Sequence, residues 1–316
     1  MIVTEEDLRP MLVSARRRLT PHIEEFTLAP ADGAALPEHG PGAHVTVRTP
    51  SGAMRRYSLV GESGAGSYTI AVKREPQSRG GSESMHERAQ VGSTLMVAPP
   101  ENEFELVEAD DYLLIAGGIG VTPIYAMARK IGQAGGNFRL IYVSRTADEA
   151  AYLAEMKEAF GERLIVHHDE GDPDRLYDFW DHFEKPAPMH VYCCGPKPLM
   201  EEIEAISGHW PEGRVHFEDF KPVDIVRPDD EAFDVELARS GRTVHVPADR
   251  SILEAVRDAG VETSSSCESG TCGSCRTRLI AGDVDHRDMV LMDEERSGSI
   301  MICVSRAKSG SLVLDL

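Results

Sequence analysis

Several features are scarce in this 316-residue sequence. Only six residues are cysteine and two are tryptophan, and aromatic residues make up 6% of the chain. The longest apolar run, from Tyr112 to Ala128, is interrupted by glycines and a proline. It therefore predicts a strand, a turn and a helix, and it excludes a membrane span. The N-terminal residues carry no basic stretch and no apolar core, so we expect no secretory signal and a cytoplasmic protein.

Basic residues are also in deficit. Lysine and arginine number 33 against 53 aspartates and glutamates, which gives a net charge of −20. This charge disfavours nucleic acids and anionic membranes as partners, and we expect neither. The first third of the chain nevertheless contains several basic residues that could hold a phosphate-bearing ligand: Arg55, Arg56, Lys73, Arg74 and Arg79.

The common hydrolase motifs are missing. The 12 histidines form no H-E-x-x-H pattern, and the chain has neither a G-x-S-x-G elbow nor a G-x-x-x-x-G-K-[ST] loop. A zinc peptidase, a serine hydrolase and a nucleoside triphosphatase therefore lack support.

Four of the six cysteines form the most informative pattern: Cys267, Cys272, Cys275 and Cys303. Their C-x4-C-x2-C…C spacing is that of a plant-type [2Fe–2S] cluster. Zinc is a weaker alternative, because structural zinc sites usually use two separated C-x2-C pairs. Disulfides are weaker still, because the other two cysteines, Cys193 and Cys194, are adjacent.

The cluster loop also has suitable residues between its ligands. Gly270 and Gly273 can take left-handed turns that fold the loop amides toward a cluster. We therefore expect an electron-transfer protein.

The chain divides into regions with different patterns. Residues 1–107 contain short β-prone stretches separated by Gly and Pro, which predict a small antiparallel barrel. Residues 108–220 alternate strands with helices, which predicts a parallel α/β sheet. Residues 221–231 contain two prolines and four acids and predict a linker. Residues 232–316 begin with a β-hairpin and a capping box, Ser251-x-x-Glu254, and predict a compact α+β domain.

The predicted strands of the first region are His44–Thr49, Arg56–Val60, Tyr68–Lys73 and Thr94–Ala98. In the second region the predicted strands are Tyr112–Ala116, Phe138–Ser144, Leu164–His168 and His190–Cys194. The predicted helices there are Ile124–Ile131, Glu149–Ala159 and Pro198–Ile206.

A glycine-rich turn connects the first strand and helix of the second region. It contains Gly117, Gly118, Ile119, Gly120, Thr122 and Pro123. Its glycines permit close approach of a phosphate, and the helix N-terminus supplies unpaired amides. A tight turn without a ligand remains an alternative, because Pro123 stands where the dinucleotide fingerprint requires its third glycine. A second turn, Cys194-Gly195-Pro196, ends another strand at the same sheet edge and favours a nucleotide site.

The barrel region contains a third candidate site. Arg56, Tyr57 and Ser58 lie on a predicted strand, and Arg79, Gly80, Gly81 and Ser82 lie on a predicted loop. An arginine can clamp a phosphate, an aromatic ring can pack on a planar ligand, and a serine can donate to a ring nitrogen. An exposed arginine beside a core tyrosine is the alternative. A nicotinamide delivers two electrons as hydride, whereas the cluster accepts one, so a flavin is required between them.

The order of these motifs resembles the reductase components of Rieske non-haem iron oxygenases, within the ferredoxin-NADP reductase-like superfamily. The resemblance covers essentially the whole chain, with SSSCESGTCGSC and Asp285–Val290 as its most specific stretches. It implies an antiparallel β-barrel flavin domain, a parallel-sheet α/β nucleotide domain and a β-grasp plant-type ferredoxin domain. The position of the ferredoxin domain at the C-terminus implies FMN within this family. The resemblance also implies NADH as the electron donor.

The resemblance also implies roles for individual residues. Arg56, Tyr57 and Ser58 contact the isoalloxazine and the ribityl phosphate, the strand Ala71, Val72 and Lys73 flanks the flavin, and Arg79 to Ser82 bind the phosphate. Four residues are implied at the reacting centre: Ser58, Thr122, Cys194 and Phe220. Thr122 is expected near flavin and nicotinamide, Cys194 near the nicotinamide C4, and Phe220 over the flavin ring. A core position for Phe220 is the alternative.

The choice between NADH and NADPH rests on two residues. Arg145 follows the second strand of the α/β region, where it could accept a 2′-phosphate. The resemblance favours NADH, with Asp169 as the acid that binds the ribose.

We therefore expect a monomeric reductase that passes electrons from NADH through FMN and the cluster to a Rieske oxygenase acting on an aromatic ring. Another acceptor, such as a demethylase, hydroxylase or cytochrome, is an alternative. A non-enzymatic iron–sulfur redox sensor is a further one.

Overall fold

The computed structural model describes residues 7–76, 80–220, 227, 229–265, 270 and 273–316. Contacts divide the chain into two compact units. One contains Arg9–Ala53 and Tyr57–Phe220, and the other contains the described residues after 220 together with residues 7–8 and 54–56.

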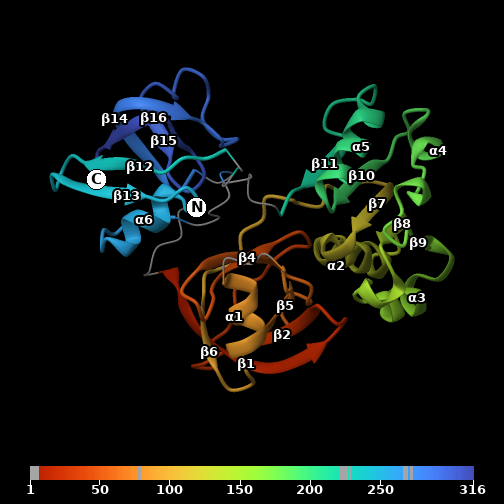
Figure 1. Ribbon diagram of the computed structural model, residues 1–316. Helices are drawn as coiled ribbons and strands as arrows, with labels where there is room; N and C mark the ends of the chain where they lie inside the picture. Colours follow the sequence, from red (N-terminus) through yellow and green to blue (C-terminus); the bar gives the residue numbers. More distant parts are fainter. Residues whose placement is uncertain (1–6, 77–79, 221–226, 228, 266–269, 271–272) are drawn as a thin grey trace. The chain divides into compact units, whose positions relative to one another are not determined.

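An antiparallel barrel forms the first part of the chain (Figure 1). Its elements are β1 (Arg9–Arg18), β2 (Ile23–Pro30), β3 (His44–Arg48), β4 (Met54–Ser58), β5 (Tyr68–Lys73), α1 (Gly81–Arg88) and β6 (Thr94–Val97). The strand order is β4-β3-β6-β1-β2-β5, and a bridge between Leu59 and Ile70 closes the barrel. The four strands predicted here are confirmed to within two residues at each end, whereas β1, β2 and α1 were not predicted.

A five-stranded parallel sheet follows. Its strands are β7 (Asp111–Gly117), β8 (Asn137–Ser144), β9 (Leu164–His168), β10 (His190–Cys194) and β11 (Val215–Glu218), in the order β11-β10-β7-β8-β9. Its helices are α2 (Val121–Gln133), α3 (Leu153–Phe160), α4 (Trp180–Phe183) and α5 (Lys197–Ser207). Helices α2 and α3 cover one face and α4 and α5 the other (Figure 1). The predicted parallel α/β domain is confirmed.

One predicted helix of this domain begins later than expected. The sequence favoured Glu149–Ala159, but a 3-10 turn occupies Ala147–Glu149 and α3 begins only at Leu153. Tyr152 interrupts the helical path because its φ is +59°. That backbone conformation is rare for a residue with a Cβ.

The C-terminal domain is a β-grasp fold, as the resemblance implied. It contains β12 (Phe233–Leu237), β13 (Arg242–Val246), α6 (Ile252–Asp258), β14 (Arg276–Asp285), β15 (Ser299–Met301) and β16 (Arg306–Leu314). The strand order is β13-β12-β16-β14-β15, with β12 parallel to β16. The predicted capping box is confirmed, because Glu254 N donates to Ser251 Oγ at 3.1 Å and Ser251 N donates to Glu254 Oε2 at 2.9 Å. This box fixes the start of α6, whose apolar face packs on the sheet.

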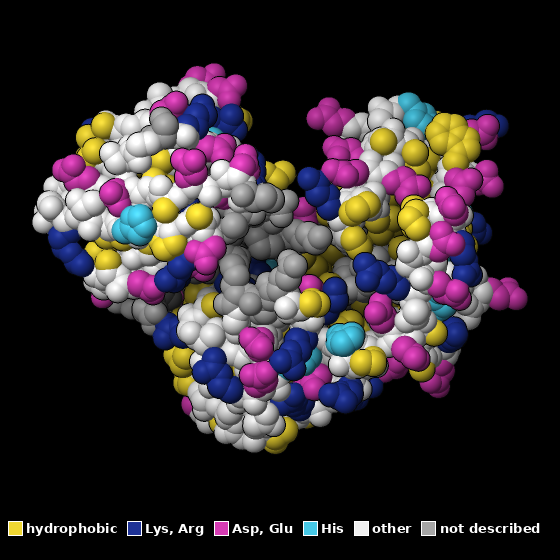
Figure 2. All heavy atoms as spheres, viewed as in Figure 1, with side chains coloured by type: hydrophobic (Ala, Val, Ile, Leu, Met, Phe, Trp, Pro, Cys, Tyr) yellow, Lys and Arg dark blue, Asp and Glu magenta, His cyan; other side chains and the backbone are white. Residues whose placement is uncertain are grey.

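The molecular surface carries charges of both signs. Figure 2 shows acidic and basic side chains interspersed over the face drawn, without a continuous basic surface. Within the part of the chain that the structure describes, no helix has both the length and the apolarity needed to cross a membrane.

Candidate functional site

The two glycine turns of the α/β domain lie against each other. Strands β7 and β10 are neighbours, with Ala116 opposite Cys194. A Cβ added to Gly120 would lie 2.2 Å from the carbonyl oxygen of Cys194, and one added to Gly117 would lie 2.6 Å from Pro196 Cδ. No side chain fits at either position, so the turns can pack closely only because glycine occupies both. The predicted proximity of the two turns is confirmed.

The N-terminus of α2 lies at this sheet edge. The 3-10 turn Gly118–Gly120 leads directly into α2, and among the described residues no side chain caps the helix. Thr122 is buried, and its hydroxyl donates to the carbonyl of Ile119 at 3.1 Å. Pro123 lies in the first helical turn, where its missing N–H costs nothing. Uncapped first-turn amides and the helix dipole favour an anion here.

The adjacent cysteines Cys193 and Cys194 point to opposite faces of the sheet. Cys193 packs with the α5 side and Cys194 with the α2 side, and neither is exposed. Burial raises the pKa of Cys193 to about 12 and that of Cys194 well above its usual range. Both therefore stay protonated thiols, and Cys194 can shape a nicotinamide pocket but cannot act as a base or nucleophile. Its place near the nicotinamide stays a prediction.

The two candidate ribose-binding residues are neighbours. Ser144 and His168 are paired at the ends of β8 and β9, so Arg145 and Asp169 follow side by side. The Asp169 carboxylate accepts a hydrogen bond of 2.7 Å from Gly171 N, which fixes its own turn. Both residues lie at the sheet edge that carries the glycine turns, since all five strands are parallel.

Ser58 is the most informative residue of the barrel. It ends β4, is 5% exposed, and its Oγ has no hydrogen-bond partner within the described residues. A buried hydroxyl without a partner costs free energy. A ligand with a hydrogen-bonding ring edge would satisfy it, so this position fits a flavin. Its strand neighbours are Arg56 and Tyr57, and Tyr57 packs on the barrel core.

Strand β5 connects the barrel to the nucleotide turn. Val72 faces the barrel core, whereas Ala71 belongs to the same apolar cluster as Val60 and Val121. Val121 is the first residue of α2, so this side of the barrel lies beside the glycine turn. Lys73, at the end of β5, pairs with Glu75 at 3.2 Å and is partly exposed.

The predicted phosphate loop Arg79–Ser82 is in part a helix. Arg79 lies outside the described residues, Gly80 is the N-cap of α1 with φ +87°, and Gly81 and Ser82 begin the helix. Among the described residues no side chain caps this helix. Serine and glycine in GSESMHER suggested a loop, although Glu83 in the first turn and Arg88 in the last signal a helix. The helix supports the prediction that this segment binds the flavin phosphate, because the N-terminus of a helix favours an anion.

Phe220 lies shortly after β11 and is 40% exposed. The alternative of a core phenylalanine is therefore wrong. An exposed aromatic ring is available to cover a planar ligand, but its role stays a prediction.

Two of the four predicted cluster ligands lie close together in the C-terminal domain. Cys275 immediately precedes β14 and Cys303 follows β15, and the antiparallel pairing of Arg276 with Met301 brings these ends together. Both cysteines are buried, at 5% and 2% exposure. Gly270 and Gly273 have φ of +78° and +79°, which confirms the predicted left-handed turns. Cys267 and Cys272 lie outside the described residues.

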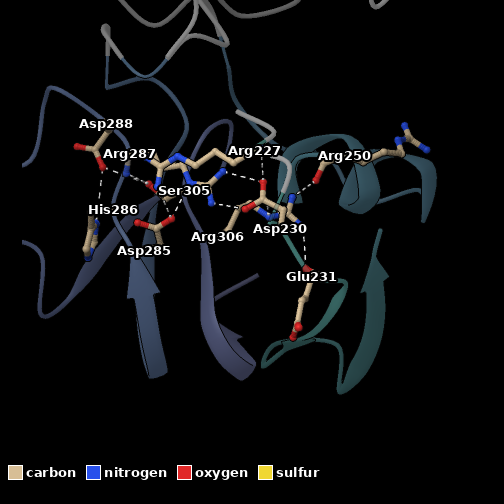
Figure 3. Close-up of polar contacts among 10 residues, drawn as sticks. All are labelled: Arg227, Asp230, Glu231, Arg250, Asp285, His286, Arg287, Asp288, Ser305 and Arg306. Carbon is tan, nitrogen blue, oxygen red and sulfur yellow. Dashed lines mark hydrogen bonds and ion pairs between the residues drawn. The ribbon is translucent and has the colours of Figure 1, made fainter. Parts of the chain in front are cut away.

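A buried ionic cluster next to this loop was not predicted from the sequence. Figure 3 shows Arg287 and Arg306 converging on Asp230, which lies within the predicted linker. Arg287 Nη1 donates to Asp230 Oδ2 at 2.9 Å, and Arg306 is 1% exposed. Such long-range pairs between distant residues leave no periodic signal in the sequence.

Two family models match the chain. An oxidoreductase NAD-binding domain covers residues 114–205, and a 2Fe-2S iron-sulfur cluster binding domain covers residues 235–308. The first contains both glycine turns and the second contains all four cluster cysteines.

Several relatives match over nearly the full length of this chain. The phthalate dioxygenase reductase of Burkholderia cepacia is 45% identical over 99% of this chain and 98% of its own. The phthalate 4,5-dioxygenase oxygenase reductase subunit of Pseudomonas putida is 48% identical over 96% and 95%. A solved structure of phthalate dioxygenase reductase, described as modular for electron transfer from pyridine nucleotides to [2Fe-2S], superposes with a TM-score of 0.88 at 45% identity and covers 99% of both chains.

These matches agree with the geometry of the glycine turns, the barrel and the cysteine loop. The predicted cofactors, NADH, FMN and a [2Fe–2S] cluster, are those of an electron-transferring reductase with this fold. The chain belongs to the phthalate dioxygenase reductase family of oxidoreductases.

Proposed function

We propose that this chain is the reductase component of a phthalate-type aromatic-ring dioxygenase. Electrons from NADH leave through the [2Fe–2S] domain to a separate Rieske non-haem iron oxygenase. The observation that carries the proposal is the packing of the α2 turn against Val60 and Ala71 of the barrel, with the buried Ser58 hydroxyl, which has no partner among the described residues, two positions before Val60. The names of the full-length relatives support the dioxygenase and its substrate class.

The proposal assigns one task to each region. Residues 1–107 hold FMN, residues 108–220 bind NADH, residues 221–231 connect the two parts, and residues 232–316 carry the cluster. FMN, when bound, supplies the exchange between hydride and single-electron chemistry.

The nucleotide site works mainly by positioning. Gly117 and Gly120 allow the backbone to approach the pyrophosphate, and the first amides of α2 bind it. Gly195 and Pro196 form the opposite wall, and Cys194 fills the space below as a neutral thiol. Asp169 binds the ribose hydroxyls and favours NADH, while Arg145 stays in solvent. No general base is required, because hydride transfer depends on alignment of the reacting atoms.

The barrel residues orient the flavin in the same way. Ser58 donates its buried hydroxyl to the ring, Tyr57 and Arg56 line the same strand, and Phe220 excludes water from the ring face. Thr122, buried in the first turn of α2, is expected at the junction of the two ligands. The N-terminus of α1, with Gly80 to Ser82 and Arg79, binds the phosphate.

The first test is the absorption spectrum of the purified protein, with its flavin and iron content, before and after anaerobic addition of NADH. We expect about one FMN and two iron atoms per chain, as a [2Fe–2S] flavoprotein requires, and bleaching of both chromophores. Zinc in place of iron, or a protein that binds no flavin after reconstitution, would contradict the proposal.

A second test separates the two electron carriers. Cys303→Ser should remove the cluster and abolish cytochrome c reduction, while NADH still bleaches the flavin, because the nucleotide site lies in the other unit. Cys193→Ala, which changes a buried cysteine outside both sites, is the matched control. Unchanged electron output from the Cys303 variant would refute the assignment of the fourth ligand.

A further inference from the structure

The two most exposed of the large apolar side chains described lie close together in the sequence. Met289 is 76% exposed and Met292 is 68% exposed. They alternate with inward-facing residues, since Asp288 and Leu291 are 6% and 4% exposed. The segment 288–292 therefore presents two methionines to solvent from a fixed base. Isolated exposed apolar residues need no explanation, but two on one short segment mark a candidate contact surface.

This segment is attached directly to the cluster loop. Met289 N donates to the carbonyl of Gly270 at 3.0 Å. A Cβ on Gly270 would lie 3.3 Å from Asp288 Cα, and one on Gly273 would lie 3.4 Å from Val290 Cγ1. Gly270 lies between the first two predicted cluster ligands and Gly273 between the second and third. The segment that carries the methionines therefore contacts the loop of the predicted cluster ligands, from which electrons leave.

A buried carboxylate holds the segment in place. Asp288 Oδ2 accepts hydrogen bonds from Leu291 N at 2.8 Å and Val290 N at 3.3 Å, and Asp288 Oδ1 accepts from Ser305 Oγ at 3.2 Å. Ser305 is two residues beyond the ligand Cys303. Figure 3 shows Asp288 and Ser305 joined in this network. The exposure of the methionines is therefore a property of a well-anchored turn.

The border of the patch is acidic. Asp293, Glu294 and Glu295 directly follow Met292. Asp293 pairs with Arg296 at 3.0 Å and Glu295 pairs with Arg276 at 2.7 Å, which leaves the run with a net negative charge. Asp293 has a side chain that is 90% exposed. A complementary partner would present an apolar contact surrounded by basic side chains. Methionine suits such a contact, because its flexible thioether adapts to the partner's shape.

We propose that Met289 and Met292, with the acidic run 293–295, form the surface on which the oxygenase docks to receive electrons from the cluster. This inference rests on the proposed function. The proposed partner is a separate protein. The test must distinguish it from the alternative partner of this surface, which is the flavin barrel of the same chain.

The test compares a Met289→Gln/Met292→Gln variant with the wild type, using the purified phthalate oxygenase component that turns over with the wild-type chain. We expect the KM for the oxygenase to rise at least tenfold with little change in kcat, while anaerobic reduction of the cluster by NADH keeps its wild-type rate. Ile280→Gln is the matched control. Ile280 is 50% exposed and lies five residues along β14 from Cys275, about 16 Å in an extended strand.

A second variant tests the acidic border. Glu294→Gln should raise the KM for the oxygenase by about twofold to fivefold at low ionic strength and have no effect at high salt.

An unchanged KM in the double methionine variant would overturn the proposal. Slower reduction of the cluster within the chain would also overturn it, because the patch would then contact the chain's own flavin domain. If the wild-type chain supports no oxygenase turnover, the proposed function fails, which is a different result from either of these.

Discussion

The hydroxyl of Tyr152 donates a hydrogen bond of 2.9 Å to Glu25 Oε2, from the α/β domain to the barrel. Arg17 joins the same contact, with Nε 3.0 Å from Glu25 Oε1 and Nη1 2.7 Å from Glu155 Oε1. Burial raises the pKa of Tyr152 above its usual range, so this hydroxyl stays a donor. The unusual backbone of Tyr152, with φ +59°, persists because these contacts determine its position.

We expect Tyr152→Phe to lower the free energy of unfolding by about 2 kcal/mol, the value typical of a hydrogen bond to a charged group. It should also slow flavin reduction by NADH, because the contact holds the nucleotide domain against the barrel. Urea unfolding and stopped-flow absorbance measure the two effects. In the control Tyr177→Phe, which removes a 3.0 Å contact to His182 within one domain, flavin reduction should keep its rate. Equal rates in both variants would show that the Tyr152 contact does not align the domains.

The sequence predicted most of what has a local or periodic signal. The cysteine spacing, the two glycine turns and the Ser251–Glu254 capping box are such signals, and the structure confirms the turns and the box. Strand β1 gave no alternating apolar signal along its whole length. Its last buried apolar residue is Val13, and the strand ends in Arg16, Arg17 and Arg18.

The missed elements depend on side-chain contacts that leave no periodic pattern in the sequence. Arg16 and Arg17 pair with Glu24 and Glu25 across the β1–β2 hairpin, so charged residues stabilise a strand that looks like a loop. Tyr152, whose hydroxyl donates to Glu25 of the barrel, delays the start of the predicted helix to Leu153. The unsatisfied hydroxyl of Ser58 is likewise visible only once its surroundings are known.

Ser58→Ala distinguishes a ligand-binding hydroxyl from a structural one. The Oγ has no partner within the described residues, so its removal should leave the stability of the flavin-free protein unchanged or slightly higher. FMN should bind about tenfold more weakly, equivalent to about 1.4 kcal/mol, because a buried hydrogen bond to the ring is lost. Flavin fluorescence titration and thermal unfolding of the flavin-free chain measure the two quantities.

The control for Ser58 is Ser93→Ala, which removes a barrel hydroxyl that donates to Gln90 O at 2.6 Å. This change should leave FMN affinity as it is. Loss of stability in the flavin-free Ser58 variant, with unchanged FMN affinity, would assign Ser58 to the barrel core and not to the flavin.

Gly120→Ala tests the packing of the two turns. Its Cβ would lie 2.2 Å from Cys194 O, so the turns must separate, at a cost of about 1–3 kcal/mol. NADH should then bind at least tenfold more weakly, which isothermal titration with a non-reacting NADH analogue measures. Gly132→Ala, where the new Cβ would meet Phe138 at 3.7 Å, should keep NADH affinity and gain up to about 1 kcal/mol of helix stability. Normal NADH affinity in the Gly120 variant would place the nucleotide elsewhere.

Asp230 joins the end of the predicted linker to the ferredoxin domain. Its carboxylate accepts from Arg287 Nη1 at 2.9 Å and from Arg227 N at 2.8 Å, and it lies 3.6 Å from Arg306 Nε. The hydrogen bond from Arg287 lowers the pKa of Asp230 below its usual range. Since the folded pKa is below the unfolded one, the ionised carboxylate stabilises the fold at neutral pH. That stabilisation is lost as the pH falls through the folded pKa.

Asp230→Asn should therefore lower the free energy of unfolding of the ferredoxin domain by about 3 kcal/mol at pH 7, because Arg306 and Arg287 lose a buried counter-charge. The difference from the wild type should stay constant from pH 7 down to about 4, near the unfolded pKa of Asp, and close only below that. Asp283→Asn removes an exposed partner of Lys308 and should cost less than about 1 kcal/mol. Urea unfolding at several pH values, followed by the cluster absorbance, measures the difference. If the difference in free energy of unfolding between the wild type and Asp230→Asn disappeared between pH 7 and 5, another group, and not the Asp230 carboxylate, would supply the stabilisation.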